Sequence, residues 1–128
     1  MMVLDASCAV ALALGDEDAP ADLRGSDLVG ALAPTMWPYE VLSAIRNAER
    51  RGRLDEGAAD HVSALLAELP LEFVHPDYTS VLAVARATQL SIYDASYVAL
   101  ALAHDVPLFT LDRKLGSAAA SVGVHVLP

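Results

Sequence analysis

The sequence predicts an α/β fold, a three-layer α/β/α sandwich around a central, mainly parallel sheet of about five strands. Short apolar runs alternate with segments of helical periodicity along the whole chain, which is typical of strand–helix–strand units with right-handed crossovers. The apolar runs are continuous, as expected for strands buried on both faces. With 128 residues the chain has the length of one domain, which we expect to span residues 1–128 around a single core.

Five apolar runs are the predicted strands, at residues 1–4, 28–36, 71–74, 106–112 and 124–128. The intervening segments are the predicted helices, at residues 7–14, 21–25, 38–52, 54–69, 76–89, 91–105 and 113–123. Pro34 is expected to shorten or interrupt the second strand, because proline lacks a backbone N–H. Pro38 suits a first helical residue and Gly52 a helix C-cap, so both ends of the third helix are marked.

Composition argues against several classes of function. The net charge is −9, with 17 acidic and 8 basic residues, which argues against a broad basic surface that grips nucleic acid by charge alone. A phosphate-bearing substrate would therefore need a bound cation or a local group of arginines. Cys8 is the only cysteine, so an internal disulfide and a thiolate metal cage are excluded.

The apolar start of the chain differs from a secretion signal, because it has no basic leading residues and carries Asp5 within the run. We expect instead a buried strand that passes into a helix. No segment reaches the roughly 18 uncharged apolar residues of a membrane span. These observations predict a cytoplasmic protein with no membrane-embedded part.

Four acidic residues lie within a turn of a predicted strand–helix junction: Asp5, Glu40, Asp94 and Asp112. In a parallel sheet the helices that follow strands begin at the carboxyl edge, and this edge is where open α/β folds bind ligands. We therefore expect the four carboxylates to face one rim. Ser7 follows the first acid by two residues, and Thr110 precedes the last acid by two. Each of these two carboxylates could thus have a hydroxyl partner.

Capping is the structural alternative for each acid. Asp and Glu are common in the first turn of a helix, where they cap the backbone or complement the dipole, and Ser91 with Asp94 resembles a capping box. Asp77 also lies at a predicted helix start, and no chemistry is assigned to it. We expect the strand before Asp77 at the sheet edge, whereas the strands before Asp5 and Asp112 should flank the centre.

Four carboxylates crowded at one rim would repel one another unless a cation neutralised them, so the site predicts a metal. Oxygen-only ligands with retained waters favour Mg²⁺ or Mn²⁺ over Zn²⁺, which prefers histidine and cysteine. The 4 histidines are scattered and show no paired ligand spacing. We therefore expect them to be ordinary surface or core residues.

The acids lie in segments that resemble the PIN-domain ribonucleases, specifically the VapC-type toxins of bacterial toxin–antitoxin pairs. These segments are MVLDAS, PYEVLSAIRNAERRGRL, LSIYDASYVALALAHDVPLFTLDRKL and GVHVLP, and they span the chain from end to end. The resemblance implies a catalytic, metal-binding quartet with two supporting hydroxyls: Asp5, Glu40, Asp94 and Asp112, with Ser7 and Thr110. The implied reaction is hydrolysis of RNA phosphodiester bonds by a metal-activated water, with Mg²⁺ or Mn²⁺ as cofactor.

The resemblance also implies partners: RNA as the substrate, a second copy in a homodimer, and a cognate VapB-type antitoxin. Such an antitoxin would lay an apolar segment in a groove and block the site. DNA would be contacted only indirectly, through the antitoxin. The mean hydropathy of +0.40 is high for a small domain, so part of the apolar surface is expected in an interface.

The basic residues concentrate in one place. Arg46, Arg50 and Arg53 recur at helical spacing near the end of the third predicted helix. They form either a solvated helix end, where arginine suits the dipole, or a contact for the RNA backbone or a partner. Arg113 and Lys114 follow the fourth acid, and they either touch a substrate phosphate or balance the nearby carboxylates.

Other functions of α/β sandwiches fit less well. A phosphoacceptor domain would need a lysine at the end of a late strand, whereas Lys114 lies within a predicted helix start. A dinucleotide-binding domain would need a glycine-rich turn, which VLDASCA lacks. The remaining alternative is a module of the same fold that binds RNA or a protein partner without catalysis.

Overall fold

The computed structural model describes residues 1–15, 23 and 25–128. Its centre is one sheet of five short strands, β1 (Val3–Leu4), β2 (Leu32–Pro34), β3 (Glu72–Val74), β4 (Leu108–Phe109) and β5 (Val126–Leu127). Every strand pairing is parallel, and the order across the sheet is β3-β2-β1-β4-β5. The prediction of a mainly parallel sheet of about five strands is confirmed.

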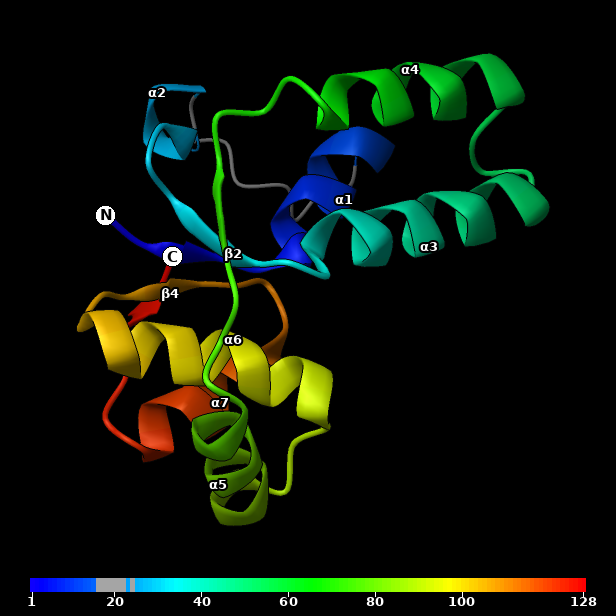
Figure 1. Ribbon diagram of the computed structural model, residues 1–128. Coiled ribbons are helices and arrows are strands. Elements are labelled where there is room, and N and C mark those ends of the chain that lie inside the picture. Colours follow the sequence, from blue (N-terminus) through cyan, green and yellow to red (C-terminus); the bar gives the residue numbers. More distant parts are fainter. Residues whose placement is uncertain (16–22, 24) are drawn as a thin grey trace.

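Helices cover both faces of this sheet (Figure 1). Their bounds are α1 (Ala6–Leu14), α2 (Gly25–Leu28), α3 (Trp37–Arg50), α4 (Glu56–Leu66), α5 (Tyr78–Thr88), α6 (Ile92–His104) and α7 (Arg113–Ser121). Helices α1, α3 and α4 lie on one side, and α5, α6 and α7 on the other (Figure 1). The chain is thus a three-layer α/β/α sandwich. None of its described helices combines the length and the apolar character of a membrane span.

The second strand begins later than the sequence predicts. Residues 28–36 were the expected strand, but pairing starts at Leu32. The one-turn helix α2 ends at Leu28, and Gly30 has a φ of +77°, a left-handed conformation that glycine adopts without strain. This turn keeps the backbone from extending earlier. The brief helix expected at residues 21–25 lies mostly outside the described residues.

The edge strand β3 is not buried on both faces, contrary to the expectation from its apolar pattern. Glu72 and Phe73 are exposed, whereas every residue of β1 and β2 is buried. The difference follows from the strand order, since β1 and β2 have a neighbouring strand on each side and β3 does not. The expected edge position of the strand before Asp77 is confirmed.

The helix α6 is apolar around most of its circumference because it packs against both the sheet and α5. Every residue from Ala95 to Ala101 is buried. Its first turn is different, because Ile92 and Tyr93 are exposed and Asp94 is half-buried. The helix thus passes from the rim of the sheet into the core.

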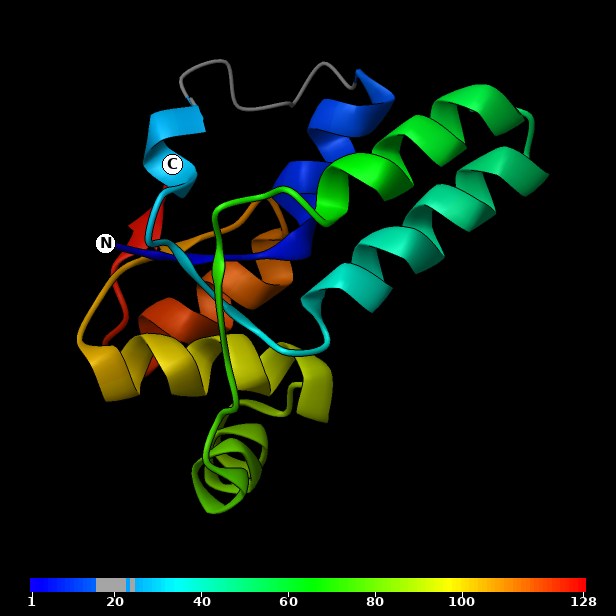
Figure 2. The same cartoon turned by 45° about the horizontal axis from the view of Figure 1, so that its top comes forward.

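The helices α3 and α4 form a hairpin that extends beyond the sheet, as both views show (Figure 1 and Figure 2). Asp55 caps α4, since its carboxylate accepts a hydrogen bond from the Ala58 N–H at 2.7 Å. None of the described residues of α4 is buried. The hairpin therefore leaves part of an apolar face open.

Candidate active site

The four acids line one open pocket of about 550 Å³ at the carboxyl edge of the sheet. Its lining residues are Asp5, Ala6, Ser7, Val10, Ala11, Glu40, Ala44, Asp94, Leu111 and Asp112. Asp5 directly follows β1, and Asp112 directly precedes α7. Glu40 and Asp94 lie in the first turns of α3 and α6. The fold therefore brings together side chains that are far apart in the sequence.

Asp5 is 5% exposed and does not cap the helix that follows it. Its Oδ2 atom accepts two short hydrogen bonds instead. The Ser7 hydroxyl donates at 2.7 Å, and the Thr110 hydroxyl donates at 2.7 Å. The capping alternative thus does not hold for Asp5, whose carboxylate is buried and held by hydroxyl groups.

Thr110 serves a different carboxylate from the one expected. The sequence pairs it with Asp112, two residues later, but its hydroxyl donates to Asp5 and accepts from the Asp112 backbone N–H at 3.0 Å. The strand pairing explains this, because Leu4 pairs with Phe109 and the following residues are neighbours. Ser7 also spans the two segments, since its Oγ atom accepts from the Leu111 N–H at 3.1 Å.

The two remaining aspartates differ in their relation to the helix ends. Asp112 is exposed and caps α7, since its Oδ1 atom accepts from the backbone N–H groups of Lys114 (3.0 Å) and Leu115 (3.1 Å). Capping therefore holds for Asp112, which also lines the pocket. In α6 the cap is Ser91, whose hydroxyl accepts from the Asp94 N–H at 3.1 Å.

Tyr97 is a pocket partner that the sequence analysis missed. Its side chain is buried, and its hydroxyl donates to Glu40 Oε1 at 3.2 Å. The only sequence signal is its position three residues after Asp94, which places both on one face of α6. The contact links the second turn of α6 to the first turn of α3.

The electrostatics of the pocket oppose the ionised state of Asp5, Glu40 and Asp94. Burial raises the pKa of Asp5, with a smaller increase from Asp112, while the Ser7 and Thr110 hydroxyls lower it. Burial raises the pKa of Glu40 to about 7, against the lowering effect of Tyr97, and the charges of Asp5 and Asp94 add to the rise. A bound cation would offset this repulsion.

Asp94 follows the same pattern. Burial is the main cause that raises its pKa, and the charges of Asp112 and Asp5 raise it further. Lys114 lowers the pKa of Asp94, so this lysine lies close enough to act on the pocket. Arg113 directly follows Asp112 in the sequence, but it is the neighbouring Lys114 that lowers the pKa of an acid in the pocket.

The donor chemistry fits a hard divalent cation, because carboxylate and hydroxyl oxygens dominate the polar lining and repel one another without one. The side chains do not form a closed cage of protein ligands around an ion. In the described part of the chain, no group of three or more His, Cys, Asp or Glu residues is placed to hold a metal ion together. Mg²⁺ typically keeps several waters and uses one or two carboxylates, so the open arrangement suits it.

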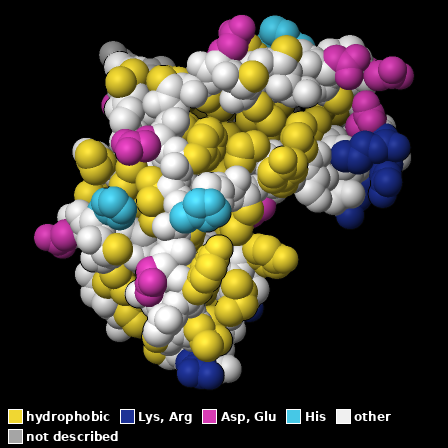
Figure 3. All heavy atoms as spheres, in the orientation of Figure 1, with side chains coloured by type: hydrophobic (Ala, Val, Ile, Leu, Met, Phe, Trp, Pro, Cys, Tyr) yellow, Lys and Arg dark blue, Asp and Glu magenta, His cyan; other side chains and the backbone are white. Residues whose placement is uncertain are grey.

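The arginine cluster lies away from the acids. Arg46 and Arg50 belong to the C-terminal half of α3, whereas Glu40 lies in its first turn. Arg46 forms an ion pair with Glu49 on the same helix. Arg53 lies beyond the end of α3, so the helical spacing expected from the sequence does not extend to it. Figure 3 shows lysine and arginine side chains gathered at the tip of the α3–α4 hairpin.

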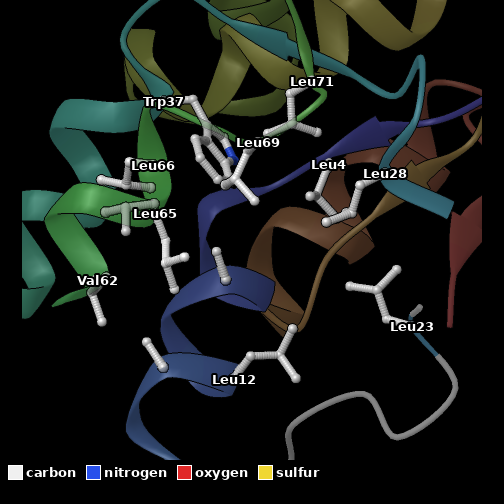
Figure 4. Close-up of a pocket in the computed structure, with 13 residues that line it drawn as sticks. Leu4, Leu12, Leu23, Leu28, Trp37, Val62, Leu65, Leu66, Leu69 and Leu71 are labelled. Atoms are coloured by element: carbon white, nitrogen blue, oxygen red, sulfur yellow. The ribbon is translucent and has the colours of Figure 1, made fainter. Parts of the chain in front are cut away.

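A second pocket, of about 310 Å³, is lined mainly by side chains of α1, α3 and α4 (Figure 4). Its described lining is entirely apolar: Leu4, Ala9, Leu12, Ala13, Leu23, Leu28, Trp37, Val41, Val62, Leu65, Leu66, Leu69 and Leu71. Helix α1 contributes Leu12 to this apolar pocket and Val10 to the acid pocket. Helix α3 contributes Val41 to the apolar pocket and Ala44 to the acid pocket. These two helices form the wall between the pockets.

Comparison with known proteins identifies relatives along the whole chain. Residues 2–120 match the family profile described as the PIN domain. Ribonuclease VapC9 of Mycobacterium tuberculosis and a VapC ribonuclease of Mycobacterium bovis are each 35% identical over 133 residues, covering 100% of this chain and 99% of the relative.

Two crystal structures share the fold. PAE2754 from Pyrobaculum aerophilum has a TM-score of 0.77 at 26% identity and covers 98% of this chain and 83% of its own. VapC20 of Mycobacterium tuberculosis, described as a Sarcin-Ricin loop cleaving toxin, has a TM-score of 0.66 at 16% identity and covers 100% of both chains. At that identity VapC20 supports the fold alone.

Proposed function

The chain belongs to the PIN-domain family, and from this membership we propose that it is the toxin of a toxin–antitoxin pair, an endoribonuclease that hydrolyses RNA phosphodiester bonds. The observation that carries the proposal is the buried Asp5 carboxylate, which makes no helix-cap bond and lines a pocket with three further acids. A buried carboxylate of this kind destabilises a fold, and such groups gather at functional sites. We assign the activity to a single domain, residues 1–128.

The acid pocket is the proposed metal site, where Asp5, Glu40, Asp94 and Asp112 would hold Mg²⁺ or Mn²⁺, some of them through water molecules that the ion retains. When bound, such an ion polarises the scissile phosphate and lowers the pKa of a water molecule that serves as the nucleophile. Ser7 and Thr110 fix the orientation of Asp5 through its Oδ2 atom. Tyr97 does the same for Glu40 through Oε1.

RNA binding needs positive charge near the acids, and this acidic chain supplies little of it. We assign Lys114 and its neighbour Arg113 to the phosphates next to the scissile bond, because the charge of Lys114 acts on Asp94. Arg46, Arg50 and Arg53 lie farther along α3 or beyond it, so we assign them to an outer stretch of RNA or to a protein partner.

The proposed partners follow from the same family membership. We place the protein in the cytoplasm, as a homodimer that a cognate VapB-type antitoxin holds inactive, with DNA contacted only through that antitoxin. The open apolar pocket supports a protein partner, since large uncovered apolar surfaces mark interaction sites.

Cleavage by the purified protein tests the proposal. The protein is expressed without an antitoxin and incubated with total RNA in Mg²⁺ or Mn²⁺, and the cleavage ends are sequenced. We expect defined ends that disappear in EDTA and in Asp5→Asn. The sequenced ends also identify the RNA target.

The alternative is a PIN-fold module that binds RNA or a partner without cutting it. Wild-type protein that binds RNA but leaves it intact in either metal would favour this module over the nuclease. Cleavage that persists in EDTA would contradict the metal-dependent mechanism, because in that mechanism the acids act by holding the cation.

A further inference from the structure

Two exposed aromatic side chains lie directly beside acids of the acid pocket. Tyr39 precedes Glu40 in the first turn of α3, and Tyr93 precedes Asp94 in the first turn of α6. The two tyrosines are 74% and 64% exposed, so their rings are not part of the core. Among the described residues, neither ring packs against another aromatic ring. One exposed tyrosine needs no explanation, but two beside the acids of one pocket indicate a shared ligand.

The two first turns are neighbours in space. The Ser96 hydroxyl donates to the Tyr93 carbonyl oxygen at 2.5 Å and lies 3.8 Å from the Met36 Sδ atom. The Met36 carbonyl oxygen accepts from the Tyr39 N–H at 3.0 Å. Figure 1 and Figure 2 both show the start of α3 beside the start of α6. The two tyrosines therefore belong to one stretch of the pocket rim.

The charge of the chain favours stacking as a source of affinity for RNA. Proteins usually hold nucleic acid through basic contacts to phosphates, but this chain has a net charge of −9. An aromatic ring needs no charge to bind, because it stacks on the face of a base and strengthens binding with each base that it covers. Only an unpaired base offers that face, since neighbouring base pairs cover it in a duplex. The rim thus suits single-stranded nucleotides.

We propose that Tyr39 and Tyr93 stack on the unpaired bases of the two nucleotides that the scissile phosphate joins. The acids hold the cation at that phosphate, and the rings beside them fix the two flanking nucleotides. The tyrosines are thus substrate-binding residues that take no part in the hydrolysis itself. The inference rests on the proposed function, because it needs a scissile phosphate at the acid pocket.

Tyr78 provides a matched control. It also lies in the first turn of a helix and is 80% exposed, but the described lining of the acid pocket includes no residue of α5. The substrate is an RNA oligonucleotide that spans a mapped cleavage site. We expect Tyr39→Ala and Tyr93→Ala each to raise its KM at least about fivefold with little change in kcat, and Tyr78→Ala to behave as wild type.

The conservative variants Tyr39→Phe and Tyr93→Phe keep a ring that can stack. We expect both to retain a KM close to that of the wild-type protein. Alanine variants with the wild-type KM, or phenylalanine variants as impaired as the alanine variants, would overturn the proposal.

Removal of a base tests the same contact from the RNA side. The oligonucleotide is made with an abasic ribose on one side or the other of the scissile bond. With the wild-type protein each abasic position should raise the KM at least about fivefold. In each alanine variant, one of the two positions should have no further effect, because the ring that its base would cover is already absent. Independent, additive losses at both positions in both variants would overturn the proposal.

A contact between two copies of the chain is the competing role for exposed tyrosines. Analytical ultracentrifugation and thermal unfolding compare the alanine variants with the wild-type protein. We expect the same oligomeric state and melting temperature, because the rings are exposed. A variant that dissociates would assign its ring to the contact between copies and overturn its assignment to RNA.

Failure of this inference is distinguishable from failure of the proposed function. If the wild-type protein cuts RNA and the alanine variants match it, the inference alone fails. If the wild-type protein cuts no RNA, the proposed function fails, and binding of a labelled oligoadenylate of about ten nucleotides in Mg²⁺ still tests the stacking. Equal binding by the wild-type protein and the alanine variants, or no binding at all, would then overturn the inference.

Discussion

The acid pocket and the apolar pocket lie on opposite sides of the same two helices, α1 and α3, and only the acid pocket is lined by carboxylates. In the acid pocket, Asp5 is buried and Glu40 is half-buried, and this burial raises the pKa of both carboxyls. In the apolar pocket, leucines remain open to solvent. Both arrangements reduce stability, which indicates that each is kept for a ligand.

The two pockets also differ in how their polar groups are supported. Asp5 accepts bonds from two hydroxyls, and Glu40 accepts one from Tyr97. The indole N–H of Trp37 has no acceptor among the described residues. The acid pocket is therefore organised by its own hydrogen bonds before any ligand arrives.

Removal of the Asp5 charge should have the largest effect on RNA cleavage, and this effect should come from the acid pocket alone. Asp5→Asn keeps an oxygen that can accept from Ser7 and Thr110 but weakens cation binding, so RNA cleavage should fall about 100-fold or more. The melting temperature should stay unchanged or rise, because burial raises the pKa of Asp5 and so disfavours its ionised form in the folded state. Cleavage assays in Mg²⁺ and thermal unfolding measure the two effects.

The control is Asp55→Asn, which alters an exposed cap of α4 outside both pockets. Asparagine also caps helices, so neither cleavage nor stability should change appreciably. An Asp5→Asn protein that cuts RNA at the parental rate would remove Asp5 from the mechanism.

Loss of the Thr110 hydroxyl should have the next largest effect. Thr110→Val removes a donor to Asp5 and the acceptor of the Asp112 N–H, so cleavage should fall about 10- to 100-fold, as for other groups that orient a metal ligand. Stability should fall by about 1 kcal/mol. Cleavage rates at saturating Mg²⁺ measure the first effect, and urea unfolding measures the second.

Thr88→Val is the matched control, because the Thr88 hydroxyl donates to the Val84 carbonyl at 2.7 Å on α5, outside both pockets. It should lose stability but not activity. Equal cleavage by the two valine variants would mean that Thr110 does not position Asp5.

The acid pocket should also make the metal-free protein sensitive to pH. The pKa of Glu40 is about 7 in the folded state and ordinarily 4.5, so between these values the folded state binds more protons than the unfolded state. The free energy of unfolding therefore falls as the pH rises through this window. We expect a loss of about 1–2 kcal/mol between pH 5 and pH 8 in EDTA, after a discount for partial exposure.

Urea unfolding at several pH values measures this slope. Glu40→Gln should flatten it, and Mg²⁺ should restore most of the stability at pH 8, which lies above the pKa of Glu40. The fluorescence of Trp37 in the apolar pocket should not titrate over the same range in the folded protein. A slope that is the same in wild type and Glu40→Gln would show that this glutamate is not a source of the pH dependence.

Substitution of the basic residues should have the smallest effect. It should show how far from the acid pocket the protein contacts RNA. Lys114→Gln should weaken RNA binding about two- to fivefold at low salt, since it removes one phosphate contact. Arg50→Gln should weaken it less, because Arg50 ends α3 far from Glu40. Filter binding at two salt concentrations compares them. A larger loss in Arg50→Gln would place the main RNA contact at the hairpin tip.

The strands and helices were predictable because their signals are local. Proline at residue 38 and Asp55 at the start of the next helix mark ends that the structure places nearby. The second strand was predicted too long because Gly30 forms a left-handed turn within the apolar run. The exposure of β3 was missed because burial on both faces depends on neighbours in the sheet.

The sequence was enough to predict the acids of the candidate site but not the hydrogen bonds that hold them. Asp5 and Asp112 could be placed at the carboxyl edge, since each adjoins a strand end. The contacts of Thr110 with Asp5 and of Tyr97 with Glu40 join residues 105 and 57 positions apart. No spacing in the sequence contains that information.

By itself, the sequence determined the α/β class, the order of most elements and the edge of the sheet at which the acids lie. Each of these follows from apolar periodicity and helix-end residues within a few positions of one another. The tertiary structure alone decided which carboxylate the hydroxyls hold, how deeply each acid is buried and that no acceptor among the described residues meets the buried indole N–H of Trp37. Those features depend on which strands and helices become neighbours, and such contacts form only when the whole core packs.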